Sequence, residues 1–325
     1  MGMNWFKGHN IGIDLGTSTT LVYVEGRGIV YYEPTVVSVN TQTGKVLAIG
    51  YEAKGMLGRT PPHIRAIRPM KDGVITNVTV VEQMLKILMY KIGVARGFLR
   101  PKVVVAVPSG ISDVERRAVC DSIDRVGVRE VSLVAEPVAA AIGENLPIDK
   151  PLGNIVVDIG GGTTEIATIS LNGIVTFESI KIAGDEMNES IMDFLKHEYK
   201  LAIGEPTAER IKIEIGTTIT LPEEKSMEVR GTDVTTGLPK TINITSKEIR
   251  EALQKPVREI IDALKRALEH TPPELAADVI DRGIVLVGGG SLLYGLPETL
   301  SKETGLKVIR SKEPIYSVIK GTGRI

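Results

Sequence analysis

Hydrophobic and polar residues follow two alternating patterns along the chain, which together predict a mixed α/β fold. The segments 101–110 (PKVVVAVPSG) and 284–287 (IVLV) are short apolar runs, as expected of strands buried on both faces of a parallel sheet. The segment 10–16 (NIGIDLG) instead predicts a strand that ends in a turn. Segments with helical spacing separate such runs, so we expect strand–helix–strand units with helices on both sides of the sheets.

The helix expected after residue 110 has sequence signals for both of its ends. Ser112 and Glu115 fit a capping box at its start, and Gly127 fits a C-terminal stop. Between them, apolar residues recur at helical spacing, as in a helix with one buried face. This segment is therefore a candidate crossover helix.

A second helix is expected before the apolar run at 284–287. Thr271 is its predicted cap, Pro272 stands in its first turn and Gly283 marks its exit. By contrast, the segment 227–244 (MEVRGTDVTTGLPKTINI) has the alternation of a hairpin of exposed strands.

One stretch of sequence occurs twice, about 144 positions apart. The segment 154–175 (NIVVDIGGGTTEIATISLNGIV) resembles 10–30 (NIGIDLGTSTTLVYVEGRGIV). Asp14 corresponds to Asp158, each just before a glycine turn, and a Thr-Thr pair follows each turn. No long linker separates the two copies. We therefore expect two related halves of one body with a cleft between them.

Each copy reads as strand, aspartate, glycine-rich turn, threonines and strand, a pattern suited to binding phosphate. Glycines allow positive φ angles and let backbone N–H groups converge on one anion. Asp14 and Asp158 suit a hydrated Mg²⁺, which usually keeps most of its water ligands. A single copy is also compatible with an ordinary tight hairpin. Two copies with the same spacing favour phosphate binding.

Other nucleotide motifs are missing from the sequence. The chain contains neither G-x-x-x-x-G-K-[ST] nor a G-x-G-x-x-G following a strand, so neither a P-loop nor a Rossmann site is indicated. A third glycine run, Gly288-Gly289-Gly290 with Ser291, follows a predicted strand and precedes a predicted helix. Its expected role is close backbone approach to a flat ligand such as a purine nucleoside.

Composition narrows the class of protein further. The net charge is −1 and aromatic residues make up 4% of the chain, so we do not expect nucleic acid as a partner. The single cysteine, Cys120, cannot form an intrachain disulfide and is expected to be a small buried residue. No apolar run approaches the roughly 18 residues of a membrane span.

Longer motifs resemble one known family. The stretches GIDLGTSTT, VVDIGGGTTE and GIVLVGGGSLLYGLPE resemble the phosphate-1, phosphate-2 and adenosine motifs of the superfold shared by actin, Hsp70 and sugar kinases. The stretches RPMKDGVI, EPVAAAIG, AGDEMNESI and TAERIKIEIG resemble the MreB family of bacterial actins over almost the whole chain. The resemblance implies an actin-like ATPase fold of two duplicated ribonuclease H-like halves around a nucleotide cleft, with ATP/ADP and Mg²⁺ as ligands.

The resemblance also implies a subdomain division. Subdomain IA is expected at 1–33 and 76–143, with 312–325 returning to it. The other three are expected at 34–75 (IB), at 144–182 with 245–311 (IIA), and at 183–244 (IIB). Relatives usually continue into a further C-terminal helix, so a trimmed end is a further expectation.

Particular residues acquire roles through the same resemblance. Glu136, Asp158 and Asp14 are the expected catalytic residues, with Glu136 orienting the attacking water and the aspartates organising Mg²⁺ through water. The expected nucleotide-binding residues are Gly16, Thr17, Ser18, Thr19, Gly160, Gly161, Gly162, Thr163, Glu209, Arg210, Ile211, Lys212, Gly288, Gly289, Gly290 and Ser291.

Several of these residues also suit a purely structural role. Glu136 also suits a helix N-terminus through the helix dipole. Glu209 and Lys212, three positions apart, would form a surface ion pair in an ordinary helix. The first loop reads GTST where the family usually has GTAN, which leaves the hydrolysis rate and the choice between ATP and GTP open.

Membrane contact is the remaining expectation. Phe98 and Leu99 stand among cations, a pattern suited to an anionic lipid surface, although Phe98 could instead fold onto the core. Trp5 and Phe6 are a possible second anchor. The resemblance implies paired protofilaments on the inner face of the cell membrane, in the cytoplasm, working with the cell-wall elongation machinery to maintain rod shape.

Two other functions compete with a filament-forming ATPase. A small-molecule kinase of the same superfold would need a substrate pocket and a base aimed at a hydroxyl, and the sequence offers no candidate set. A chaperone-type ATPase would need a substrate-binding domain after the ATPase.

Overall fold

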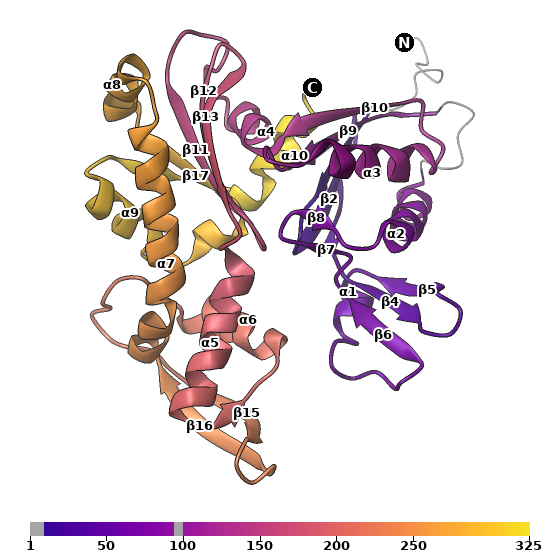
Figure 1. Ribbon diagram of the computed structural model, residues 1–325, viewed down its shortest axis with the longest axis vertical. Helices are drawn as coiled ribbons and strands as arrows, with labels where there is room; N and C mark the ends of the chain where they lie inside the picture. The colour runs from indigo at the N-terminus through magenta and orange to yellow at the C-terminus, as the bar shows by residue number, and fades with distance from the viewer. Residues whose placement is uncertain (1–9, 94–99) are drawn as a thin grey trace. The chain divides into compact units, whose positions relative to one another are not determined.

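The chain folds into two compact units, seen in a computed structural model that describes residues 10–93 and 100–325 (Figure 1). Unit 1 is formed by the chain up to Ile148 together with Ile315–Ile325, and unit 2 by Asp149–Pro314. The chain therefore passes from unit 1 to unit 2 and back again. Strands and helices alternate in both units, which confirms the α/β prediction.

The main sheet of unit 1 has five strands: β1 (Ile11–Leu15), β2 (Thr19–Val24), β3 (Gly28–Pro34), β9 (Lys102–Val107) and β10 (Glu130–Ala135). Their order is β10-β9-β1-β2-β3. Strands β1, β2 and β3 pair antiparallel, and β9 and β10 continue the sheet in parallel from the other side of β1. The helices of this unit that are longer than four residues are α2 (Val78–Lys91), α3 (Asp113–Asp124), α4 (Glu136–Gly143) and α10 (Ser317–Thr322).

Unit 2 repeats this topology. Its main sheet contains β11 (Asn154–Ile159), β12 (Thr164–Ser170), β13 (Gly173–Ile180), β17 (Ile284–Val287) and β18 (Val308–Arg310). The order β13-β12-β11-β17-β18 is that of the first sheet, with three antiparallel strands and two parallel ones. Each sheet therefore has, as its central strand, the strand that carries a repeated aspartate.

Smaller elements complete each unit. Unit 1 also has β4 (Val37–Asn40), β5 (Val46–Ile49), α1 (Tyr51–Lys54), β6 (Ile64–Ile67), β7 (Met70–Lys71), β8 (Val74–Ile75) and the end of the short helix η2 (Pro314–Tyr316). Unit 2 also has α5 (Gly184–Glu198), β14 (Leu201–Ala202), α6 (Glu205–Ile215), β15 (Ser226–Asp233), β16 (Pro239–Thr245), α7 (Ser246–Glu269), α8 (Pro273–Arg282), η1 (Gly289–Leu292) and α9 (Leu296–Thr304).

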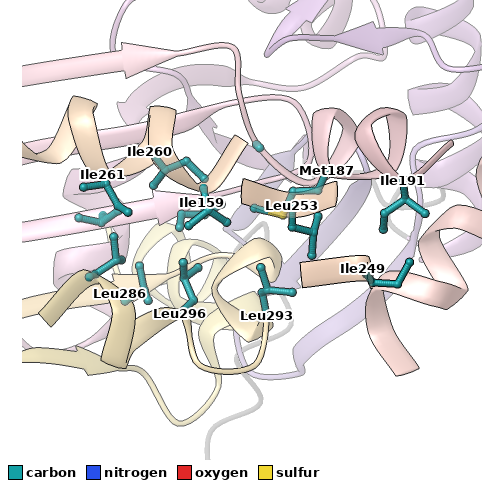
Figure 2. Packing of buried hydrophobic residues seen from close by; sticks show 14 of the residues in the cluster. Ile159, Met187, Ile191, Ile249, Leu253, Ile260, Ile261, Leu286, Leu293 and Leu296 are labelled. Carbon is teal, nitrogen blue, oxygen red and sulfur yellow. The ribbon is translucent and has the colours of Figure 1, made fainter. Parts of the chain in front are cut away.

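The hydrophobic core of unit 2 forms around the long helix α7. Figure 2 shows Leu253 and Ile260 of α7 packed with Ile159 of β11, Leu286 of β17 and Met187 of α5. These five side chains are at most 1% exposed. The core thus joins β11, which leads into the second glycine turn, to helix α5.

Unit 1 has its own core between the main sheet and its helices. Ile11 and Ile13 of β1 are 1% exposed, and they belong to the same cluster as Val105 of β9 and Leu85 of α2. Because successive strand residues face opposite sides, Gly12, between these isoleucines, and Asp14, which follows them, face the other side of the sheet.

Several local predictions can now be compared with the structure. The capping box of Ser112 and Glu115 is present at the start of α3, and Gly127 has the positive φ of 90° expected of its stop. The predicted hairpin at 227–244 is β15 and β16. Thr271 as the cap of the next helix is wrong. Its hydroxyl donates to the carbonyl oxygen of Ala267, and α8 begins two residues later.

Cys120 is half-buried rather than fully buried, because it stands on the flank of α3, and burial raises the pKa of its thiol. Within residues 10–93 and 100–325, no helix combines the length and the apolar character needed to cross a bilayer.

Candidate nucleotide site

The first glycine turn connects β1 to β2 and is tied to a buried threonine. The N–H of Gly16 donates to the carbonyl oxygen of Thr19 at 3.1 Å, which closes the turn. Thr35 is 0% exposed; its hydroxyl donates to the carbonyl oxygen of Gly16 at 2.8 Å, and its N–H to that of Ser18 at 2.9 Å. Thr35 therefore stabilises the turn by donating hydrogen bonds to two of the turn's carbonyl groups. The sequence analysis missed this residue.

Asp14 stands just before this turn, and Thr17 lies within it. Burial raises the pKa of the Asp14 carboxyl to about 7, because removal from water disfavours the charged form. A cation close to Asp14 would oppose this shift by favouring the carboxylate. The hydroxyl of Thr17 accepts a hydrogen bond from the N–H of Gly73, in the β7–β8 turn, at 3.0 Å. The first turn is thus also joined to the short hairpin of unit 1.

The second glycine turn has the same closing bond. The N–H of Gly160 donates to the carbonyl oxygen of Thr163 at 2.9 Å. The start of α5 is joined to this turn, because the N–H of Gly184 donates to the carbonyl oxygen of Gly160 at 3.2 Å and that of Asp185 to Gly161 at 2.8 Å. An α-helix N-terminus carries partial positive charge and favours anions nearby. In unit 2 the glycine turn and a helix N-terminus therefore meet.

Gly288 stands directly against Asp158. A Cβ at Gly288 would lie 2.3 Å from Oδ1 of Asp158 and 2.3 Å from the carbonyl oxygen of Ile159, and the φ of Gly288 is +80°. At Gly290, a Cβ would lie 2.4 Å from Cγ2 of Ile159. Ser291, fully buried, donates from its hydroxyl to the carbonyl oxygen of Gly288 at 2.6 Å. The third glycine run is therefore packed against the end of the strand that carries the second aspartate.

Helix α6 places Lys212 beside the start of α5. The ammonium of Lys212 donates to the carbonyl oxygen of Gly184 at 2.7 Å, so it lies next to the second glycine turn. Glu209 stands one turn earlier on the same helix and is partly buried. The side chain of Ile211 is 0% exposed and belongs to the hydrophobic core, whereas Arg210 is on the exposed side of α6. The side chain of Ile211 is therefore not available to a ligand.

Glu136 is the first residue of α4. The helix follows β10 directly, and Pro137 occupies its first turn, where a missing N–H costs nothing. Ala139, Ala140 and Ala141 are all 0% exposed, so the middle of the helix is buried in unit 1. Glu136 therefore lies at the N-terminal end of a short helix whose position is fixed by packing within unit 1.

The described acidic residues do not form a direct metal site. Within the described parts of the chain, no group of three or more His, Cys, Asp or Glu side chains is arranged to hold a metal ion. Mg²⁺ commonly uses one or two carboxylates, water and substrate phosphates instead. Asp14 and Asp158, each at the end of a central strand beside a glycine turn, fit that mode of binding. Phe98, Leu99, Trp5 and Phe6 lie outside the described residues.

Comparison with known proteins identifies relatives along nearly the full length. A family model described as "MreB/Mbl protein" matches residues 8–325. The cell shape-determining protein Mbl of Bacillus subtilis is 48% identical over 314 residues, covering 97% of this chain and 94% of the relative. The cell shape-determining protein MreB of Escherichia coli is 48% identical over 322 residues, covering 97% and 92%.

Solved structures show the same fold. MreB5 of Spiroplasma citri bound to ADP is similar with a TM-score of 0.92 at 36% identity, covering 97% of this chain and 94% of that one. The MamK double helical filament is similar with a TM-score of 0.82 at 24% identity, covering 97% and 98%. The actin-like α/β fold expected from the sequence is thereby confirmed.

Proposed function

Since this chain belongs to the MreB/Mbl family, we propose that it is an actin-like protein that binds ATP with Mg²⁺, assembles into filaments and determines cell shape. Assembly is coupled to slow hydrolysis of ATP to ADP and phosphate. In support, one solved structure of MreB5 of Spiroplasma citri is described as bound to ADP and a second as bound to AMPPNP.

One observation carries this proposal. Each central strand ends in an aspartate followed by a glycine turn, and both turns are closed by the same bond, from Gly16 to Thr19 and from Gly160 to Thr163. Two chemically equivalent turns in equivalent sheets suit the two sides of one polyphosphate chain. We propose that both turns bind the same nucleotide.

The other residues divide the remaining parts of the ligand. Gly288, Gly289, Gly290 and Ser291 suit the nucleoside, because glycines allow close approach of backbone to a flat ring. Glu209 and Lys212 bind the nucleotide from α6. Because the ammonium of Lys212 lies beside Gly184 and the second glycine turn, its expected partner on the nucleotide is a phosphate or ribose oxygen. When Mg²⁺ is bound, Asp14 and Asp158 hold its water ligands, and the ion neutralises phosphate charge.

Hydrolysis then requires positioning more than covalent chemistry. The carboxylate of Glu136 accepts a hydrogen bond from a water molecule and orients its oxygen toward the terminal phosphorus. The turn amides and Lys212 stabilise the negative charge on the phosphate oxygens. Because the water must be aligned with the leaving oxygen, the rate depends on where α4 places Glu136.

The cellular role follows from assembly. We propose head-to-tail filaments of this chain, paired as protofilaments, since heterologous contacts that do not close generate open filaments. These filaments lie in the cytoplasm on the inner face of the membrane and organise the cell-wall elongation machinery. The subdomain boundaries expected from the sequence belong to the same proposal.

Membrane attachment is proposed from sequence alone. Phe98 and Leu99 are flanked by Arg96, Arg100 and Lys102, and apolar residues among cations suit an anionic lipid surface. Trp5 and Phe6 are a candidate second anchor.

Sedimentation with ATP, Mg²⁺ and anionic liposomes tests these proposals together. Three proteins are compared: wild type, Glu136→Ala, and the double variant Phe98→Ser/Leu99→Ser. Wild type is expected to sediment with liposomes and release phosphate. Glu136→Ala should assemble but release phosphate about 100-fold more slowly. The double variant should assemble without binding lipid.

Different results would contradict different parts of the proposal. A wild-type protein that binds ATP yet never assembles, with or without lipid, would rule out the filament and favour a search for a phosphoryl acceptor, as for a kinase. Assembly without lipid binding would remove only the membrane proposal.

A further inference from the structure

The C-terminal helix α10 lies against the strand that carries Asp14. A Cβ at Gly12 of β1 would lie 3.1 Å from the nitrogen of Gly323 and 3.2 Å from the carbonyl carbon of Thr322. At Gly323, a Cβ would lie 2.4 Å from Cδ1 of the Tyr23 ring on β2. The end of α10 therefore touches the sheet backbone two residues before Asp14, and a side chain at Gly12 would require its neighbours to shift.

The same helix also touches α4, backbone against backbone (Figure 1). A Cβ at Gly321 would lie 1.7 Å from the carbonyl oxygen of Ala139, and one at Gly143 would lie 1.9 Å from the carbonyl oxygen of Ser317. Ala139 comes one helical turn after Glu136. No flexible side chain separates the two helices at these points, so a displacement of α10 must displace α4.

Polar contacts hold the far end of α4. The guanidinium of Arg324 donates from Nη1 to the carbonyl oxygen of Ile142 at 2.7 Å and to Oδ1 of Asn145 at 2.9 Å. The hydroxyl of Ser317 donates to Oε1 of Glu144 at 2.7 Å. A cation at the last carbonyl groups of a helix opposes their partial negative charge and stabilises the end.

We propose that α10 is a spacer that sets the position of Glu136 relative to Asp14, with Gly321 and Arg324 as positioning residues for hydrolysis. The spacer contacts the Asp14 strand on one side and the Glu136 helix on the other. Helix α4 is about 12 Å long, so a tilt at its C-terminal end moves Glu136 at its N-terminal end. This inference rests on the proposed role of Glu136.

Arg324→Met is the principal test, because it removes the bonds at the end of α4 and leaves both helix backbones unchanged. The matched control is Arg27→Met. Arg27 likewise donates to a helix-end carbonyl in unit 1, that of Ile92 after α2, at 2.9 Å, but α2 carries no proposed site residue. Phosphate release at saturating ATP, nucleotide affinity and thermal unfolding are measured for each protein.

Arg324→Met is expected to lower the maximal rate of phosphate release about tenfold, since sub-ångström misplacement of a positioned group is enough for such a loss. Nucleotide affinity should change less than about twofold, because α10 lies behind α4 and holds no proposed ligand. Arg27→Met should leave both quantities unchanged. Gly321→Ala, if it folds, should show a larger loss of rate than Arg324→Met.

A double-variant cycle separates positioning from general loss of structure. In a Glu136→Ala background, Arg324→Met should lower the rate no further, because the group that α10 positions is gone. An equal fold-loss in both backgrounds, or an unchanged rate in Arg324→Met alone, would overturn the spacer. If Glu136→Ala itself releases phosphate at the wild-type rate, the role of Glu136 fails first, and the spacer with it.

Discussion

At the scale of single residues, close contact rather than residue chemistry determines several positions of the candidate site. Gly288 is the sharpest case, because Asp158 and Ile159 occupy the space that a side chain would need. The backbone of Gly288 is also left-handed, with a φ of +80°. Gly305 has a similar φ of +71° but no atom within 4 Å of the position of a Cβ. Comparing Gly288 with Gly305 therefore distinguishes the cost of steric overlap from the cost of backbone strain.

Substituting both glycines by alanine tests this distinction. Gly305→Ala should lower the free energy of unfolding by about 1 kcal/mol, the usual cost of a left-handed non-glycine residue. Gly288→Ala should lower it by about 3 kcal/mol, because overlap with a backbone oxygen is added to the strain, and it should weaken ATP binding. Chemical denaturation and titration calorimetry provide the two measurements. Equal losses of stability would show that the contact is not tight.

The sequence predicted two glycine turns of equal spacing after the aspartates, and both turns are present. For Gly288 it predicted close approach to a flat ligand, which stays a prediction; the contact of Gly288 with Asp158 and Ile159 was not predicted. The contact of Lys212 with Gly184 was beyond prediction, because it joins positions 28 apart through the packing of two helices. Thr35 was missed for a similar reason: a threonine between two strands has no local signal for a turn partner.

At the scale of elements, capping explains where helices begin. Thr245 caps α7: its hydroxyl accepts a hydrogen bond from the N–H of Glu248 at 3.4 Å, and Oε2 of Glu248 accepts one from the N–H of Thr245 at 2.8 Å. The capping box of α3 was predicted because its signals are adjacent in sequence. The cap of α8 was not, because Thr271 prefers a buried bond to Ala267.

Replacing the cap of α7 should have a measurable cost. Thr245→Ala should lower the free energy of unfolding of unit 2 by about 1 kcal/mol, as removal of an N-cap hydroxyl usually does. Thr245→Ser keeps the hydroxyl and should lose only a small part of that. Urea denaturation followed by circular dichroism compares the variants. A cost as large for serine as for alanine would assign the effect to the lost methyl group instead.

The β15–β16 hairpin has a carboxylate whose titration is shifted by its turn. Backbone N–H groups of Thr235 and Thr236 donate to Oδ1 of Asp233, and Lys240 donates to Oδ2; together they lower the pKa of Asp233 to about 2. The folded pKa is below the usual value of about 3.9. The contribution to stability is therefore complete above about pH 4 and is lost as the pH falls through about 2.

Carboxyl-carbon NMR titration of Asp233 measures this shift directly. Wild type is expected to titrate near pH 2, and Lys240→Met should titrate at a higher pH but still below the usual aspartate range, because the backbone donors remain. A midpoint near 4 in the wild-type protein would mean that the turn does not form in solution.

At the scale of the whole molecule, the repeated sequence predicts repeated architecture. The two main sheets share one strand order, and each central strand leads to an equivalent glycine turn. The repeat could be recognised because strand, aspartate and turn are contiguous in the chain. The contact of α10 with α4 could not, because the glycines that form it are more than 175 positions apart and carry no shared pattern.

A nucleotide bound by both glycine turns, as proposed above, should slow amide hydrogen exchange at both of them. In hydrogen exchange with ATP and Mg²⁺, amides at Gly16–Thr19 and at Gly160–Thr163 are expected to slow by at least about tenfold, since one ligand that binds both turns opposes the opening of each. Amides of the β15–β16 hairpin provide the internal control. Protection confined to one turn would mean that the two turns do not share a ligand.

The return of the chain to unit 1 has a consequence for synthesis. Unit 2 is one continuous segment, Asp149–Pro314, and can in principle fold as soon as it has left the ribosome. Unit 1 begins first but lacks α10 until residues 315–325 have been translated, so the gap beside β1 and α4 stays open while all of unit 2 is made. The half of the protein that emerges first is thus the last to be completed, and its exposed apolar surface during that interval makes nascent unit 1 the expected target of chaperones.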